Sequence, residues 1–213
     1  MDSQPNFNRF IEQSIINNWD KDALTDYKGA TLQFHDVARK IEKLHILFEN
    51  SGLHKGDKIA ICGRNSSHWA VAFLATLTYG AVAVPIQNEF KPEQIHHIVN
   101  HSESRFLFVG DVVAKEIDAE EMPSLEGILS LPDFSIVLSR SEKFTFAREH
   151  LNEIFGKRYP KYFRQEHIHY HQDQPEDLAS INYTSGTTGF SKGVMLPYHA
   201  LTGNYLFLEE VIG

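Results

Sequence analysis

Several features that place proteins in special classes are scarce or missing in this sequence. Its 213 residues include a single cysteine, Cys62, so no disulfide can form within the chain and a reducing compartment is the simpler expectation. The N-terminus has neither the basic start nor the apolar stretch of a signal peptide, and no apolar run is long enough to span a bilayer. The formal charge of −8 argues against nucleic-acid binding, which usually shows a basic stripe. We therefore expect a cytoplasmic protein with no nucleic-acid partner and no transmembrane segment, in which Cys62 is a core thiol.

The composition is that of an ordinary globular domain, with 42% hydrophobic and 23% charged residues. No internal repeat or low-complexity linker marks a domain boundary. Buried strands are indicated by short apolar runs at 58–62, 81–86, 105–109, 135–139 and 178–183. Helical patterns separate the first three of these runs. The sequence therefore predicts an α/β fold with a mostly parallel sheet flanked by helices.

The N-terminal part carries two amphipathic helical patterns, from Phe7 to Trp19 and from Phe34 to Asn50. Between them, two short segments flank Lys28 and Gly29, which predicts a small hairpin whose glycine takes a positive φ. The pattern is weakest from 111 to 174, where we expect an acidic helix after residue 111, a helix over 146–155 and loops.

Histidine is abundant, at 12 residues, so a metal site has to be considered. His167, His169 and His171 alternate, which on a strand would place three imidazoles on one face, and His97 and His101 lie one helical turn apart. No His-Glu-x-x-His helix and no Gly-x-Ser-x-Gly elbow is present. We interpret these histidines as solvated and predict neither a metal site nor a Ser-His-Asp triad.

The densest group of chemistry-bearing residues runs from Thr184 to Gly193, directly after the last apolar run. Glycines let the backbone approach a ligand, and hydroxyls, exposed amide N–H groups and a lysine are the donors that a polyphosphate needs. The P-loop spacing fails, because counting from Gly186 puts Ser191 at the second glycine and Gly193 where a Ser or Thr is required. The Gly-x-Gly-x-x-Gly spacing of dinucleotide-binding folds fails as well. We predict a phosphate loop of another kind.

This stretch, continued to Leu196, resembles the signature loop of the AMP-forming acyl-adenylate family, which includes acyl-CoA synthetases, luciferases and adenylation domains of peptide synthetases. Upstream segments at 31–52, 56–69 and 79–85 are similar to the N-terminal region of that family. The resemblance implies the N-terminal part of the large domain of an adenylate-forming enzyme. It also implies ATP, magnesium and coenzyme A as cofactor or co-substrates, and a carboxylic acid, in particular a long-chain fatty acid, as the molecule that is activated.

The resemblance carries over residue by residue at the loop. The implied phosphate contacts are Thr184, Ser185, Gly186, Thr187, Thr188, Gly189 and Lys192, and Lys192 has the implied catalytic role. Two positions depart from the family pattern: Ser191 stands where proline is usual, and Tyr198 stands where a histidine is common. His199 follows one step later, and we do not assign it that role.

In the resembling enzymes, the magnesium-binding glutamate, the acyl-binding motifs and the lysine of the C-terminal lid all lie downstream of this region. We therefore expect residues 1–213 to be a truncated N-terminal portion of the AMP-binding domain, without the lid and without a metal ligand. The alternative is a non-catalytic nucleotide-binding or partner module that keeps only the loop. A Tyr-Gly-x-Thr-Glu motif beyond Gly213 in the parent gene would favour the ligase. The sequence leaves the oligomeric state open, a homo-oligomer included.

The first prediction concerns the 213-residue chain by itself. We expect no ATP–pyrophosphate exchange with any of a panel of carboxylates, because phosphoryl chemistry depends on positioning groups that the family supplies from downstream segments. Substantial turnover by the isolated chain would contradict this.

Overall fold

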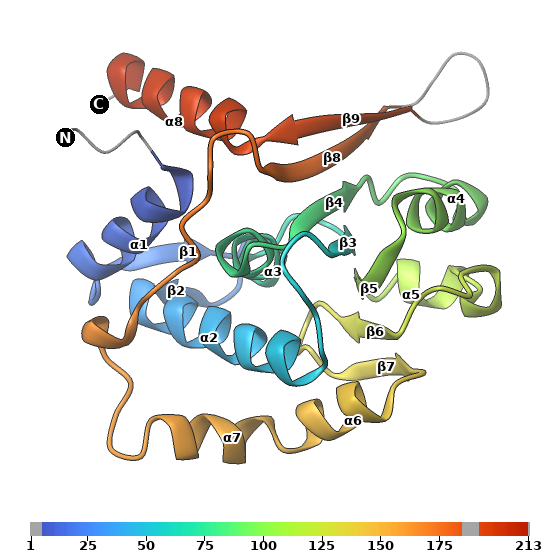
Figure 1. The fold of residues 1–213 in the computed structure, drawn as a ribbon, viewed down its shortest axis with the longest axis horizontal. Helices are drawn as coiled ribbons and strands as arrows, with labels where there is room; N and C mark the ends of the chain where they lie inside the picture. The colour runs from blue at the N-terminus through green and yellow to red at the C-terminus, as the bar shows by residue number, and fades with distance from the viewer. Residues whose placement is uncertain (1–5, 185–191, 213) are drawn as a thin grey trace.

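A seven-stranded sheet runs through the computed structural model, which describes residues 6–184 and 192–212 (Figure 1). The strands lie in the order β7-β6-β5-β3-β4-β8-β9. Their bounds are β3 Lys58–Cys62, β4 Val82–Ile86, β5 Ser104–Val109, β6 Gly127–Ser130, β7 Ile136–Ser139, β8 Leu178–Thr184 and β9 Lys192–Pro197. The five inner strands are parallel, and β7 and β9 pair antiparallel at the two edges. The predicted α/β fold with a mostly parallel sheet is confirmed.

Helices cover both faces of this sheet. Their bounds are α1 Phe7–Asn17, α2 Phe34–Asn50, α3 Ser67–Tyr79, α4 Pro92–Ser102, α5 Val113–Glu116, α6 Glu142–Glu149, α7 Leu151–Arg158 and α8 Tyr198–Ile212. On β3, Ile59 and Ile61 face the cluster formed with α2, α3 and α6, whereas Ala60 and Cys62 face the cluster formed with α4. A small hairpin of β1 (Asp22–Thr25) and β2 (Thr31–Gln33) lies between α1 and α2.

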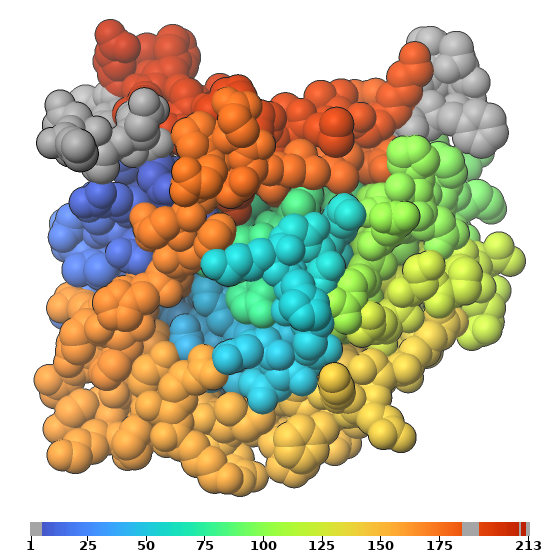
Figure 2. Space-filling model, in the orientation of Figure 1, coloured from blue at the N-terminus to red at the C-terminus, as the bar shows by residue number. Residues whose placement is uncertain are grey.

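The segment before β8 ties the two ends of the chain together. In the space-filling view it runs, in orange, from the lower border up beside the blue N-terminal helix to the red hairpin and α8 (Figure 2). Asp173 in this segment accepts a hydrogen bond from the backbone N–H of Asn8, at 3.2 Å, and the Asn8 amide donates to the Leu77 carbonyl at 3.0 Å. These contacts fix where β8 enters the sheet.

Local sequence features determine where several helices begin and end. The second helix spans Phe34–Asn50 as predicted, and the first ends two residues earlier than expected, at Asn17. The Ser66 side chain caps α3 by accepting from the Trp69 N–H, and Gly80 ends that helix with a φ of 88°. Pro92 occupies the first turn of α4.

Other expectations are wrong. The positive φ in the first hairpin belongs to Lys28, at 55°, and not to Gly29. The helix expected over 146–155 is two helices that break at His150, and the acidic helix after residue 111 is only the short α5. By contrast, the run at 135–139 forms a strand as expected, β7, which pairs antiparallel with β6. Two strands were not predicted, β6 and β9.

Cys62 is fully buried, and burial raises the pKa of its thiol to about 12, as expected of a core thiol. His167 lies in a short 3₁₀ turn, so the three alternating histidines are not on one strand. Within the described ranges, no three His, Cys, Asp or Glu side chains are grouped to hold a metal ion. No helix in the same ranges is long and apolar enough to cross a membrane.

The start of β6 generates a prediction about packing. A methyl group added at Gly127 would overlap the ring of Phe144, whose Cδ1 would lie 2.7 Å away, and that buried ring is itself stacked on Phe106 with centroids 4.8 Å apart. We expect Gly127→Ala to lower the free energy of unfolding by about 2 kcal/mol. Gly156→Ala is the control, because its methyl group meets nothing within 4 Å on a helix and should stabilise by up to about 1 kcal/mol. Urea denaturation measures both, and equal effects would contradict the packing argument.

A buried histidine on α2 generates a pH prediction. Nε2 of His45 lies 3.1 Å from the Ala75 carbonyl oxygen and 3.0 Å from Thr78 Oγ1, and burial lowers the His45 pKa from 6.5 to about 4. As the pH falls below 6.5, His45 becomes protonated in the unfolded chain, whereas in the folded chain it stays neutral until about pH 4. The free energy of unfolding should therefore fall over this window, by about 3 kcal/mol in total from this group.

The difference between pH 7 and pH 5 should be smaller in His45→Gln than in the unmodified chain. His54→Gln is the matched control, because the His54 side chain is 83% exposed. An unchanged pH dependence in His45→Gln would show that the imidazole is not held neutral.

Candidate functional site

The two predicted phosphate-loop residues that the structure describes face each other across a hairpin. Thr184 ends β8, Lys192 begins β9, and the two are cross-strand partners in the antiparallel pair. Directly opposite residues project to the same face of a sheet, so the hydroxyl and the ammonium group start from neighbouring positions. Both residues are exposed. Ser185, Gly186, Thr187, Thr188 and Gly189 lie outside the described residues, as does Ser191.

This pair lies at the carboxyl edge of the sheet. Strand β8 runs parallel to β4, so Thr184 is at the same edge as the carboxyl ends of β3, β4 and β5 (Figure 1). Ligands of open α/β sheets bind outside that edge. The hairpin therefore places Thr184 and Lys192, the two ends of the loop, at the edge of the sheet where a nucleotide is expected to bind.

Where the structure describes the chain again after β8, at Lys192, the chain forms a strand and not the helix that follows a P-loop. The chain returns along β9, whose last residue Pro197 pairs with Leu178 at the start of β8, and α8 begins at the next residue. The N-terminus of α8 is thus at the amino edge, a strand length away from Thr184. The positive end of the α8 dipole therefore does not lie beside Thr184 and Lys192, and we expect the donors of this loop to be its amides, its hydroxyls and Lys192.

Tyr198, which stands where the family commonly has a histidine, and His199 after it lie at that amino edge as well. Tyr198 is 2% exposed, and its hydroxyl donates to the Leu77 carbonyl oxygen at 2.7 Å. Nδ1 of His199 lies 3.1 Å from the Pro175 carbonyl oxygen and 3.5 Å from a carboxylate oxygen of Glu176. Tyr198 is therefore a core residue, and His199 is placed away from the loop.

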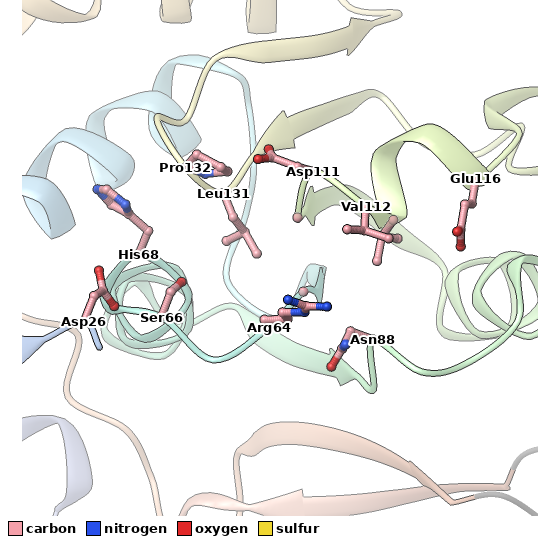
Figure 3. A pocket seen from close by; sticks show the side chains of 13 residues that line it. Asp26, Arg64, Ser66, His68, Asn88, Asp111, Val112, Glu116, Leu131 and Pro132 are labelled. Carbon is pink, nitrogen blue, oxygen red and sulfur yellow. The ribbon is translucent and has the colours of Figure 1, made fainter. Parts of the chain in front are cut away.

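A cavity that sequence reasoning missed opens at the carboxyl ends of β3 and β5. It has a volume of about 640 Å³ and lies between the loops that follow these strands (Figure 3). Gly63 follows β3 and Gly110 follows β5, and a methyl group on Gly110 would lie 3.3 Å from the Gly63 Cα. A methyl group on Gly63 would lie 2.6 Å from Leu131 Cδ1. The two glycines allow the loops to approach closely. The sequence feature that could have indicated this cavity is the glycine that follows each of the two apolar runs.

The walls of this cavity differ in chemistry. Arg64 and Asn88 lie on one side, and Asp111, Val112 and Leu131 lie across from them (Figure 3). In the described part of the chain, Arg64 has no hydrogen-bond or ion-pair partner. At the far end of the cavity, Asp26 accepts hydrogen bonds of 2.7 Å from both the Ser67 N–H and the Ser67 hydroxyl, and these bonds lower the Asp26 pKa. Asp26 is thus occupied in holding the start of α3, whereas Arg64 is available to an anion.

Curated relatives of the chain are acyl-activating ligases. The acyl-CoA ligase sidI of Beauveria bassiana is 22% identical over 184 residues, which are 86% of this chain and 31% of the relative. The fatty acyl-CoA synthetase A of Dictyostelium discoideum is 28% identical over 181 residues, which are 81% of this chain and 24% of the relative. The chain spans about a third of the length of the curated relatives that it matches, or less.

Solved structures share the fold. A long-chain-fatty-acid-CoA ligase from Archaeoglobus fulgidus matches with a TM-score of 0.74 at 22% identity, over 97% of this chain and 39% of its own. The anthranilate CoA ligase AuaEII, solved in complex with anthranoyl-AMP, also matches with a TM-score of 0.74, at 21% identity, over 97% of this chain and 36% of its own. The sequence profile described as AMP-binding enzyme matches residues 11–212. The chain belongs to the AMP-binding enzyme family.

Proposed function

We propose that this chain supplies the phosphate-binding part of an ATP-dependent acyl-CoA ligase. In this reaction a carboxylate attacks the α-phosphorus of ATP, the acyl-adenylate forms and pyrophosphate leaves. The thiol of coenzyme A then takes the acyl group and AMP is released. The observation that supports the proposal best is the cross-strand pair of Thr184 and Lys192 at the carboxyl edge of a parallel sheet, in a chain of the AMP-binding enzyme family.

The proposed roles follow from the chemistry of each group. The hydroxyls of Thr184, Ser185, Thr187 and Thr188 donate to the β- and γ-phosphates, together with the backbone amides that Gly186 and Gly189 let come close. The ammonium group of Lys192 meets the negative charge that grows on the departing pyrophosphate. A point charge on a long stem suits this task, because it can follow the leaving group.

For the acid, we propose a long-chain fatty acid. The support comes from relatives described as a fatty acyl-CoA synthetase, long chain acyl-CoA synthetases and a long-chain-fatty-acid–CoA ligase. A structural neighbour that activates anthranilate shows that the same fold also serves an aromatic acid. The choice of acid therefore has to be tested directly, with fatty acids of increasing length against benzoate-type acids in the same exchange assay.

Magnesium accompanies ATP in the proposed reaction. Residues 6–184 and 192–212 contain no group of three His, Cys, Asp or Glu side chains that is placed to hold a metal. We assign no step to the ion here.

Changing Lys192 to alanine in the full-length protein tests the central role. We expect Lys192→Ala to lower kcat for ATP–pyrophosphate exchange by about 10- to 100-fold, because a charge-assisted hydrogen bond to the phosphates is lost. The dissociation constant of the fatty acid, measured separately by calorimetry, should change much less.

Lys157→Ala is the matched control, since Lys157 is an exposed lysine on α7 that pairs with Glu153 one turn away. It should leave both quantities unchanged. Equal losses of exchange and of acid binding in Lys192→Ala would show that Lys192 has a structural role instead.

A further inference from the structure

Tyr183 is the β8 residue directly before Thr184, and its side chain packs between the β8–β9 hairpin and α4. It is 6% exposed and belongs to the same apolar cluster as Ile98 and Val99 of α4. Its partner across the hairpin is Gly193, where a methyl group would lie 3.1 Å from Cζ of the tyrosine ring. The ring thus occupies the space that a side chain on β9 would need.

The Tyr183 hydroxyl reaches the last turn of α4, where Nδ1 of His101 lies 2.6 Å away. The two rings meet edge to face, with centroids 5.7 Å apart and planes at 89°. Burial raises the pKa of Tyr183, so the hydroxyl stays protonated and can donate a hydrogen bond to Nδ1 of His101. In the space-filling view, the red and orange hairpin borders directly on the green of α4 (Figure 2).

The position of this contact in the hairpin matters. Tyr183 directly precedes Thr184, and Gly193 directly follows Lys192, so the Tyr183–Gly193 pair is the first one below the loop. Successive side chains of a strand point to opposite faces. Tyr183 therefore points toward α4 while Thr184 and Lys192 point away from it, and a shift of the tyrosine ring would tilt both of them.

We propose that the hydrogen bond between His101 and Tyr183 positions the base of the phosphate loop, so that Thr184 and Lys192 are held in place before ATP binds. This inference rests on the proposed function, since ATP is the ligand of that reaction. A loop whose ends are fixed loses less conformational freedom on binding, which favours affinity for the nucleotide. His101 and Tyr183 are positioning residues, and neither touches ATP.

The test uses ATP–pyrophosphate exchange by the full-length protein with the variants Tyr183→Phe and His101→Leu. Each removes one partner of a single hydrogen bond, so each should raise the KM for ATP about five-fold while the KM for the acid stays unchanged. The double variant should be no worse than the poorer single variant. His101→Asn should restore most of the loss, because its side-chain amide places a polar atom near the position of Nδ1.

Tyr79→Phe is the matched control. It removes another partly buried tyrosine hydroxyl, which donates to the Leu53 carbonyl oxygen at 2.8 Å and lies away from the loop. This variant should lower stability without changing the KM for ATP. An unchanged KM for ATP in Tyr183→Phe and His101→Leu, or losses that add in the double variant, would overturn the proposal.

A second readout separates this inference from the proposed function. If none of the carboxylates supports ATP–pyrophosphate exchange by the unmodified protein, the proposed function fails. The role of the hydrogen bond is then tested by amide hydrogen exchange. Tyr183→Phe should speed exchange in β8 and β9 while β5 stays as protected as in the unmodified protein. Equal protection of β8 and β9 in both proteins would overturn the positioning role whatever the reaction is.

Discussion

Much of this structure depends on the parallel pairing of β3 with β4 on one side and with β5 on the other. Because parallel crossovers are right-handed, the connection from β3 to β4 and the connection from β4 to β5 have to pass over opposite faces of the sheet. This separates α3 from α4 and buries both faces of β3. The connections from β3 to β4 and from β5 to β6 run in opposite directions along the sheet. By the same rule, the loops after β3 and β5 lead to opposite faces beyond the close contact of Gly63 with Gly110, and the cavity opens there. At the amino edge, by contrast, the Arg105 side chain joins three segments by donating to Glu126, Asp57 and the Gly52 carbonyl oxygen.

The sequence predicts those parts of the fold that local chemistry determines. The apolar runs of β3, β4 and β5 are buried on both sides and read as strands without alternation, and Ser66 and Gly80 mark the ends of α3 by cap geometry. β6 is only four residues long and begins with a glycine, Gly127, that is required by a phenylalanine from a distant helix. In β9 the apolar stretch is only Val194-Met195-Leu196, its residues are exposed or half-buried, and its conformation comes from pairing with β8. Tertiary pairing of this kind leaves no periodic signal in the sequence.

The candidate site divides in the same way. The loop was found from composition, since three glycines, several hydroxyls and a lysine in one short stretch are typical of a turn that binds phosphate. That Thr184 and Lys192 are cross-strand partners could not be predicted, because the return strand itself was not. The cavity was missed because its walls come from five separate segments, and only the topology of the sheet brings Arg64 opposite Val112. The link from Tyr183 to His101 joins residues 82 positions apart, with no pattern that connects them.

The hairpin also explains why this loop has its particular composition. A phosphate loop that leads from a strand into a helix uses the helix N-terminus, with oriented N–H groups and a partial positive charge. Here the chain turns back along β9, and α8 starts at the opposite edge of the sheet, so that source of positive potential is absent at the described ends of the loop. Hydroxyls and a lysine have to supply the missing donors. Side-chain donors are less rigid than a helix terminus, so the strands that carry them have to be held in place. Tyr183, which is buried and hydrogen-bonded to His101 of α4, is placed to hold the end of β8.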